Sequence, residues 1–319
     1  MPKRRGLSRS LPVLIGILFL FILFVVGFIS GPLGATLFGD LGLPSWLSVP
    51  RPEPKLPAEA VFHLFGFPIT NTLLAAWFTI IVLIVIFFAA TRKIKLIPSR
   101  LQTLLEFAIG GLLSFCQSVA GEKNGRRFFP IVATIFLFVL LNAWLSLLPG
   151  FGSIEVITAE GEHVHLLRGA NTDINVPLAL ALVSFVFVEY FGLRSHGLRY
   201  LGKFINVGQF FRSLGQLFRG KFKAGLSGLF NGVIDIFVGI LETLSELIRI
   251  VSFTFRLFGN MTAGEILLLI AAFLVPWVMV LPFYGLELLV GFVQALIFAG
   301  LTLVFVTIAV TPPHHAEPA

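Results

Sequence analysis

The sequence predicts an all-α integral membrane protein. Of its 319 residues, 57% are hydrophobic and only 12% are charged, and the mean hydropathy is +0.97. A soluble domain of this length could not bury so much apolar surface. The apolar residues also gather in long runs bounded by charges and prolines, which is the pattern of membrane-spanning helices.

Six apolar runs are long enough to cross a bilayer, so we expect about five to six hydrophobic helices. The runs cover residues 11–30, 70–91, 128–148, 174–192, 226–274 and 283–311. The first run is ambiguous, because Lys3, Arg4 and Arg5 ahead of an apolar stretch also mark a signal peptide. Its apolar core of roughly 18–20 residues is longer than that of a usual signal peptide, which favours an uncleaved anchor.

The chain divides by composition into two parts. Residues 44–58 contain five prolines and predict an extended linker of polyproline character. We therefore separate an N-terminal anchor or signal-like segment with its linker, residues 1–55, from a membrane domain, residues 56–319.

Residues 99–120 predict an amphipathic helix that lies at the membrane surface. Pro98 precedes the segment, Gly121 follows it, and it is too polar to span. Its apolar stripe consists of Leu101, Leu104, Leu105, Ala108, Ile109, Leu112 and Leu113.

The basic residues predict the topology. With the N-terminus inside, eighteen lysines and arginines lie in inside segments, and only Arg51, Lys55 and Arg168 lie in outside loops. This asymmetry is a strong positive-inside signal, and it places the N-terminus in the cytoplasm. The net charge of +7 therefore requires no nucleic-acid partner.

The run 226–274 is too long for one perpendicular span. A single helix of about 45–49 residues would be on the order of 70 Å long, against a hydrocarbon core of ~30 Å. We expect it either to break, near Gly239 or Gly259, or to lie steeply tilted.

This run also places ionisable groups at membrane depth around Arg256. A guanidinium there costs at least ~2.5–3.5 kcal/mol, so it should face a bundle interior or a wet cavity with acidic partners, although a structural ion pair is the alternative. At about 100° per residue, six polar or charged side chains fall within about 60° of Arg256 around the helix axis. They are Asp235, Glu242, Ser245, Arg249, Ser252 and Asn260. Glu246 falls near 80°.

Acidic residues lie on both sides of Arg256 along the helix. Glu242 is ~21 Å toward the inside and Glu265 ~14 Å toward the outside, on the opposite face. Glu287 and Gln294 share one face of the last run, because they are seven residues apart. Since a permanent charge between them repels a proton, the sequence indicates two half-channels that need a second, mobile carrier.

Several motifs then resemble subunit a of F-type ATP synthases. The most specific is Arg256-Leu-Phe-Gly-Asn-Met-Thr-Ala-Gly-Glu265, and the likeness continues through Glu287 and the run that begins at Gln294. Asn171-Thr-Asp-Ile-Asn-Val-Pro and Phe128-Phe-Pro-Ile-Val-Ala are similar to that family as well, so that the resemblance covers roughly residues 60–311. Residues 1–55 are an addition, and the position of Glu287 is a histidine in some relatives.

The resemblance implies a stator whose two long, tilted C-terminal helices pack against a rotating ring of c subunits, together with b subunits of a peripheral stalk. It implies Arg256 as the translocation arginine. The outer half-channel would contain Glu265, Glu287, Gln294 and Asn260. The inner one would contain Glu242, Ser245, Arg249, Glu246 and Asp235. The setting would be the inner membrane of a bacterium, with proton coupling or, alternatively, sodium coupling.

Other functional classes are less consistent with the sequence. No Walker-type phosphate loop is present, so we expect no nucleotide chemistry and no cofactor on this chain. An unrelated secondary transporter would normally show paired repeats, and we find none. His163 and His165 could bind a metal, but a solvated loop is the simpler interpretation, and Asn142 could line the outer path or bond a neighbouring helix.

Overall fold

The computed structural model describes residues 7–39, 57–92, 99–158, 161, 163–204, 212–213 and 222–311, with the single positions 44, 47, 51, 52 and 94. The signal-like basic start and most of the proline-rich linker therefore lie outside the described residues. The expectations for those two segments stay predictions.

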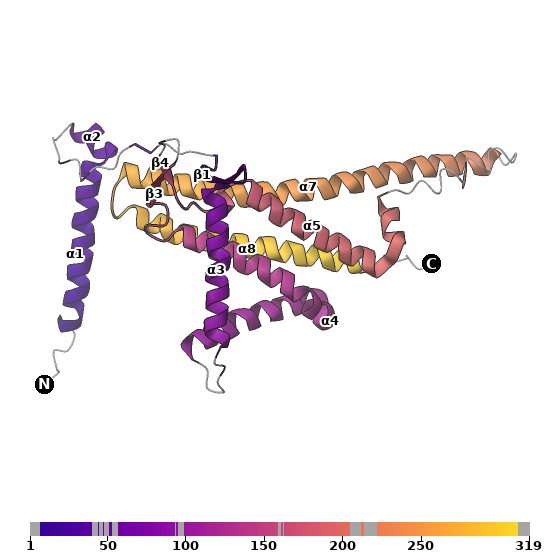
Figure 1. Cartoon of the computed structure of the whole chain (residues 1–319), viewed down its shortest axis with the longest axis horizontal. Helices are drawn as coiled ribbons and strands as arrows, with labels where there is room; N and C mark the ends of the chain where they lie inside the picture. The colour runs from indigo at the N-terminus through magenta and orange to yellow at the C-terminus, as the bar shows by residue number, and fades with distance from the viewer. Residues whose placement is uncertain are drawn as a thin grey trace. The chain divides into compact units, whose positions relative to one another are not determined.

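The described chain is helical, with two small antiparallel hairpins (Figure 1). Its elements are α1 Leu7–Ser30, α2 Pro32–Phe38, β1 Ala60–Leu64, β2 Phe67–Thr70, α3 Asn71–Thr91, α4 Arg100–Ser146, β3 Glu155–Ile157, β4 His163–His165, η2 Ala170–Thr172, α5 Asn175–His196, η3 Gly197–Lys203, α7 Phe222–Leu274 and α8 Val280–Val310. Among the described residues, six helices are long and apolar enough to cross a membrane: α1, α3, α4, α5, α7 and α8. The predicted all-α membrane fold is confirmed.

Helix α4 joins two segments that the sequence kept apart. The amphipathic stretch and the following apolar run meet at Gly121, whose φ of 78° and ψ of 164° interrupt the helix without a loop. A positive φ favours glycine, which explains the residue at this kink. Of the predicted apolar stripe only Leu112 is buried, while Leu101 and Leu104 are exposed. If this stretch lies at the membrane surface, as the sequence predicts, such side chains would face the acyl chains and their exposure would cost little.

Helix α7 runs unbroken from Phe222 to Leu274, so of the two alternatives the break near Gly239 or Gly259 is wrong. Gly239 has a packing role instead: a Cβ there would lie 2.5 Å from the carbonyl oxygen of Phe204. At 1.5 Å per residue the helix is about 80 Å long, which leaves a strong tilt as the remaining expectation if it lies in a bilayer.

The chain forms two compact units, and α3, α4, α7 and α8 contribute residues to both. The first unit consists of Met1–Thr79, Leu140–Asp173 and Gly259–Val293. The second consists of Ile80–Val139, Ile174–Phe258 and Gln294–Ala319.

The second unit has an apolar core. Phe128 is fully buried and meets Phe187 and Phe191 edge to face, with ring centroids 6.0 and 5.1 Å away. Such pairs add about 0.5–1.5 kcal/mol beyond area burial. The only side-chain hydrogen bond between α5 and α8 in the described structure joins the Ser184 and Thr302 hydroxyls at 2.7 Å.

The first unit has a more polar interior. Thr72 Oγ1 donates to Asp173 Oδ2 at 2.9 Å, and Asn142 Nδ2 donates to Thr79 Oγ1 at 2.9 Å. The backbone N–H of Asn171 donates to Asn142 Oδ1 at 3.3 Å. These bonds tie α3, α4 and the segment before α5 together, as buried polar groups require.

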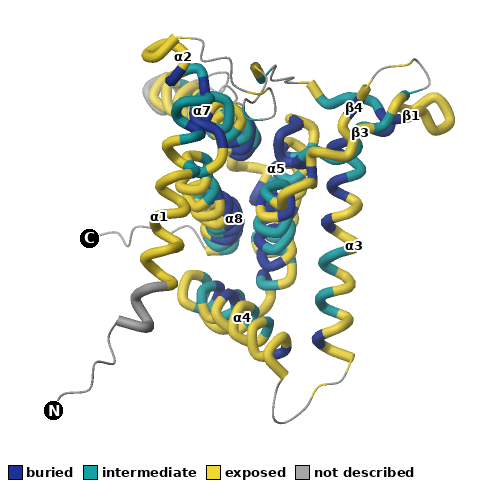
Figure 2. The backbone as a smooth tube through the Cα atoms, turned by 90° about the vertical axis from the view of Figure 1, so that its left-hand side faces the viewer, coloured by how far each residue is buried: buried dark blue, intermediate teal, exposed yellow. Residues whose placement is uncertain are grey.

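Burial by residue is shown in Figure 2, where α1 is mostly exposed.

Threonines in the helices bond their own backbone. The hydroxyls donate to the carbonyl oxygen four residues earlier at 2.7–3.0 Å in Thr79, Thr134, Thr243, Thr254, Thr302 and Thr307. A hydroxyl satisfied in this way can lie in apolar surroundings without a separate partner.

Candidate functional site

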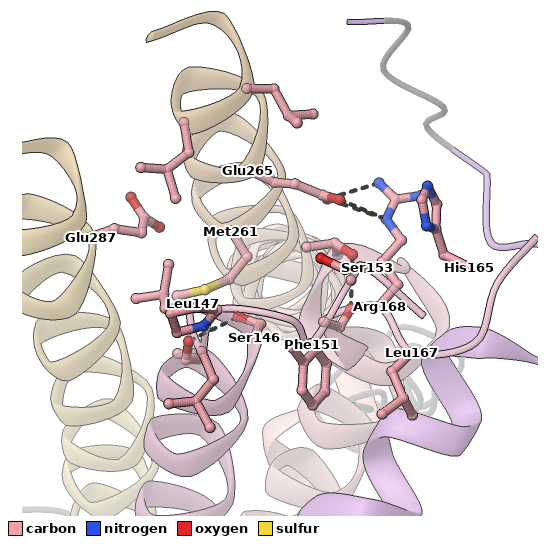
Figure 3. A pocket seen from close by; sticks show the side chains of 18 of the residues that line it. Ser146, Leu147, Phe151, Ser153, His165, Leu167, Arg168, Met261, Glu265 and Glu287 are labelled. Carbon is pink, nitrogen blue, oxygen red and sulfur yellow. Dashed lines mark hydrogen bonds and ion pairs between the residues drawn. The ribbon is translucent and has the colours of Figure 1, made fainter. Parts of the chain in front are cut away.

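The first unit contains a cavity of about 430 Å³ that brings two predicted acids together. Glu265 of α7 and Glu287 of α8 both line it, as do His165 and Arg168 (Figure 3). Asn142 of α4 lines it as well. The cavity is large enough for several waters, and its polar groups offer them partners. Asn142 both lines the cavity and bonds neighbouring segments, so the two alternatives for this residue coexist.

Arg168 binds Glu265 through a two-point contact. Arg168 Nε donates to Glu265 Oε1 at 3.1 Å, and its Nη2 donates to Oε2 at 2.9 Å. The Nη1 group donates to the backbone carbonyl of Pro57 at 3.2 Å. This fork geometry is the strong form of an arginine–carboxylate pair. The side chain of Arg168 is 12% exposed and that of Glu265 is 34% exposed, so solvent screens the pair only in part, from the side of the carboxylate.

Glu287 is buried, and no hydrogen bond or ion pair joins it to another residue in the described part of the chain. Its carboxylate lies directly over Gly264 of α7: a Cβ on that glycine would lie 2.0 Å from Glu287 Oε1. The missing side chain of Gly264 therefore makes the space that this carboxylate occupies.

The second unit contains a separate ionic cluster on α7. Lys203 Nζ of η3 lies 2.5 Å from Glu242 Oε1 and 3.3 Å from Glu246 Oε1. Arg249 Nη1 lies 2.6 Å from Glu246 Oε2, and its guanidinium stacks over the ring of Phe305 at 3.7 Å. Lys203 of η3 thus joins the group that the sequence predicts on one side of α7, which consists of Glu242, Glu246 and Arg249.

Tyr200 extends this cluster toward α5. Its hydroxyl donates to Glu189 Oε1 at 3.4 Å, and its ring closely approaches Gly192. Burial, reinforced by the negative charge of Glu189, raises the pKa of the Tyr200 hydroxyl above its ordinary value. Tyr200 therefore stays a neutral hydrogen-bond donor at physiological pH.

Arg256 is exposed on α7, and its one hydrogen bond within the described chain goes from Nη2 to Ser252 Oγ at 3.3 Å. No acidic side chain among the described residues pairs with it. The alternative interpretation of Arg256, that it forms a structural ion pair within the chain, is therefore not supported by the described part of the structure.

Four predicted site residues are not joined to either cluster. Gln294 is buried in the second unit, whereas Asn260 is exposed and does not line the cavity. Ser245 is exposed and Asp235 half-buried, and neither makes a hydrogen bond to the ionic cluster. A helical projection places side chains by angle alone and does not say which of them another element covers.

The sequence reasoning missed Arg168, Lys203 and Gly264. Arg168 and Lys203 were counted only as topological charges, because both lie outside the apolar runs. The glycine had one available signal: it directly precedes Glu265, where a small residue lets another helix approach closely.

In the part of the chain that the structure describes, six apolar helices, two of which contain ionisable side chains (α7 and α8), define a multi-pass membrane protein. Comparison with known proteins specifies the family. The profile of the ATP synthase A chain matches residues 73–307, and the chain belongs to that family. The resemblance drawn from the sequence is confirmed.

Bacterial relatives agree with this assignment. The chain is 34% identical over 248 residues to "ATP synthase subunit a" of Gloeobacter violaceus, covering 77% of this chain and 86% of that protein. It is 30% identical over 227 residues to the protein of that name in Aliarcobacter butzleri, covering 71% and 83%. The protein of that name in Geobacter sp. strain M21 is 30% identical over 248 residues, covering 77% and 91%.

Proposed function

We propose that this chain is the proton-translocating subunit a of an F-type ATP synthase, in which two offset half-channels and Arg256 couple proton flow to ATP synthesis at a rotating c-ring. Residues 56–319 form the translocating domain, and residues 1–55 an additional anchor segment with its linker. The chain itself carries out no nucleotide chemistry.

The exposed guanidinium of Arg256 carries this proposal. A lone cation on a membrane helix costs at least ~2.5–3.5 kcal/mol, and the described part of the chain supplies only a serine hydroxyl to offset that cost. A carboxylate from a partner helix would neutralise it. Each c subunit in the ring would present such a carboxyl in turn, ionised beside Arg256 and protonated where it faces lipid.

The face of α7 around Arg256 fits a helical partner. Leu241, Ile248 and Phe255 recur at seven-residue intervals, and each is roughly half exposed. Residues seven apart on a helix lie nearly in line, so they form an apolar strip beside the arginine. Such a strip could slide past c-ring helices without breaking specific hydrogen bonds.

The two polar sites would serve as the ends of the path. A proton would come from the outside through the cavity that Glu265 and Glu287 line, and pass to a ring carboxylate. After rotation it would leave through the inner site at Glu242 and Glu246. Arg256 lies between these acids in the sequence of α7, and its permanent charge would prevent direct leakage.

The setting follows from the same proposal. The N-terminus would lie in the cytoplasm of a bacterium, and the b subunits of a peripheral stalk would hold this chain against rotation. Each proton that crosses a potential of 100 mV releases about 2.3 kcal/mol, which is the energy available to drive the ring.

Replacing Arg256 tests the proposal. In proteoliposomes that contain the whole complex, Arg256→Ala should abolish both ATP-driven proton pumping and ATP synthesis while the complex still assembles. Arg256→Lys should also fail, because an ammonium group lacks the planar fork and can lose its proton when desolvated. Arg126→Ala is the matched control, since that arginine is exposed and pairs only with Glu122 one turn away.

Two outcomes would change the conclusion. Normal coupled pumping in Arg256→Ala would overturn the proposed role of the arginine. ATP synthesis driven by a sodium gradient at equal pH on both sides would replace proton coupling with sodium coupling while leaving the rest of the proposal in place.

A further inference from the structure

We propose that Arg168 is a positioning residue of the outer cavity: it holds the Glu265 carboxylate by both oxygens, so that Glu287 is the carboxyl that exchanges protons there. The inference rests on the proposed function and refines it, because it gives different roles to two acids that the sequence treats alike.

The hydrogen bonds of Glu265 are the first step. Both of its oxygens accept from Arg168, at 3.1 Å for Oε1 and at 2.9 and 3.2 Å for Oε2. Adding a proton to either oxygen would remove the negative charge that strengthens the bonds to Arg168, and a charge-assisted pair is among the stronger hydrogen-bond arrangements in proteins. Glu265 is therefore poorly placed to take up and release protons in each cycle.

Arg168 is itself held in place, which is the second step. Its Nη1 donates to the Pro57 carbonyl, and its side chain is 12% exposed. The guanidinium, which lines the cavity, thus connects Pro57 in the segment before β1 with Glu265 of α7. Figure 3 shows it pointing from its loop toward Glu265. A side chain fixed at two points loses less entropy each time the pair forms.

Glu287 has the opposite surroundings, which is the third step. It lines the same cavity, yet nothing in the described structure binds its carboxylate, and Gly264 leaves it room. A proton can pass from water in the cavity to a Glu287 oxygen and leave again, with no other bond broken than the O–H bond itself. Both acids line the cavity, but of the two only Glu287 has a carboxylate that no described residue binds.

The experiment measures passive proton flux against pH through the whole complex in proteoliposomes. The variants are Arg168→Gln, Arg168→Lys, Glu265→Gln, Glu287→Gln and the double variant Arg168→Gln/Glu265→Gln. Arg51→Gln is the matched control, because Arg51 is also an arginine of an outside segment and its side chain is exposed. Assembly of each complex is checked by the yield of purified enzyme.

We expect Arg168→Gln to lower the flux about tenfold, the factor that one charge-assisted hydrogen bond is worth, and to change its pH profile, because a released Glu265 now also binds protons. Arg168→Lys should fall between that variant and the wild type. The double variant should match Glu265→Gln alone, since Arg168 acts through Glu265. If Arg168→Gln does not assemble, the double variant, which leaves no unpaired charge, still allows the comparison.

Three results would overturn the inference. They are a wild-type flux and pH profile in Arg168→Gln, additive losses in the double variant, or a normal flux in Glu287→Gln alongside a lost flux in Glu265→Gln. None of these results touches the Arg256 experiment, so the proposed function can survive when this inference fails. Normal pumping in Arg256→Ala would instead overturn the role that the proposed function gives to the arginine.

Discussion

Replacing Gly264 by alanine would place a methyl group where the Glu287 carboxylate lies. The added Cβ would be 2.0 Å from Oε1, 2.2 Å from Cδ and 2.4 Å from Oε2, whereas ordinary contact begins at 3.4 Å. The carboxylate must therefore move by more than an ångström. It can do so because it ends a flexible side chain, and the backbone of both helices can stay in place.

The change should separate stability from function. Alanine is favoured over glycine within a helix by roughly 0.5–1 kcal/mol, so we expect the thermal stability of the complex to stay equal or rise slightly. A displacement of about 1 Å at a reacting group can cost on the order of 100-fold in rate. Proton flux should fall by tenfold to about 100-fold, while assembly is normal.

The assay is passive proton flux and ATP-driven pumping in proteoliposomes, with thermal unfolding measured on the same preparation. Gly285→Ala is the control, because it makes the same exchange on α8 with no atom within 4 Å of the added Cβ. Adding Glu287→Asp to Gly264→Ala should recover part of the flux, since the shorter side chain draws the carboxylate back from the methyl group. Wild-type flux in Gly264→Ala would refute the reasoning.

Two further perturbations test other parts of the structure. Lys203→Gln leaves Glu242 without its cation beside Glu246, which keeps only Arg249, so pumping should drop several-fold. Lys203→Arg should retain most of the pumping, and equal pumping in all three proteins would count against a role for the cluster. Gly27→Val drives a Cβ to 2.2 Å from the Pro276 carbonyl oxygen, a backbone atom that cannot swing away, so the complex should lose about 1–3 kcal/mol and α1 should become more accessible to protease. Gly16→Val has open space and should behave as wild type in the same protease assay; equal digestion of both variants would show that α1 does not pack through Gly27.

Helices could be predicted from this sequence more reliably than their contacts. Each membrane helix requires about 20 apolar residues in a row, and that requirement is visible along the chain without knowledge of any neighbour. Gly239 is an example of what the sequence pattern cannot decide. A glycine in a long helix signals either a bend or a close approach of another segment, and only the carbonyl of Phe204 decides in favour of the second.

The acids of the candidate site could be predicted, but their partners could not. Glu265 and Glu287 are conspicuous because a carboxyl within an apolar run is costly. Arg168 is separated from Glu265 by 97 residues, and it belongs to a loop where a basic residue needs no explanation. Lys203 is likewise one of several charges in a segment that the sequence predicts to lie inside. Pairings of this kind depend on the path of the chain between the two residues, which periodicity does not contain.

The threonines that bond their own helix backbone have an electrical consequence. A chain of waters conducts protons only where each group along it can both give and receive one. The hydroxyls of Thr79, Thr254 and Thr302 donate their proton to a carbonyl one turn away, so each would first have to break that hydrogen bond to act as a link in such a chain. These helices would therefore contain hydroxyl groups without offering a path for protons. In a membrane that separates charge across ~30 Å, conduction would be confined to the few sites where a carboxylate remains free to exchange.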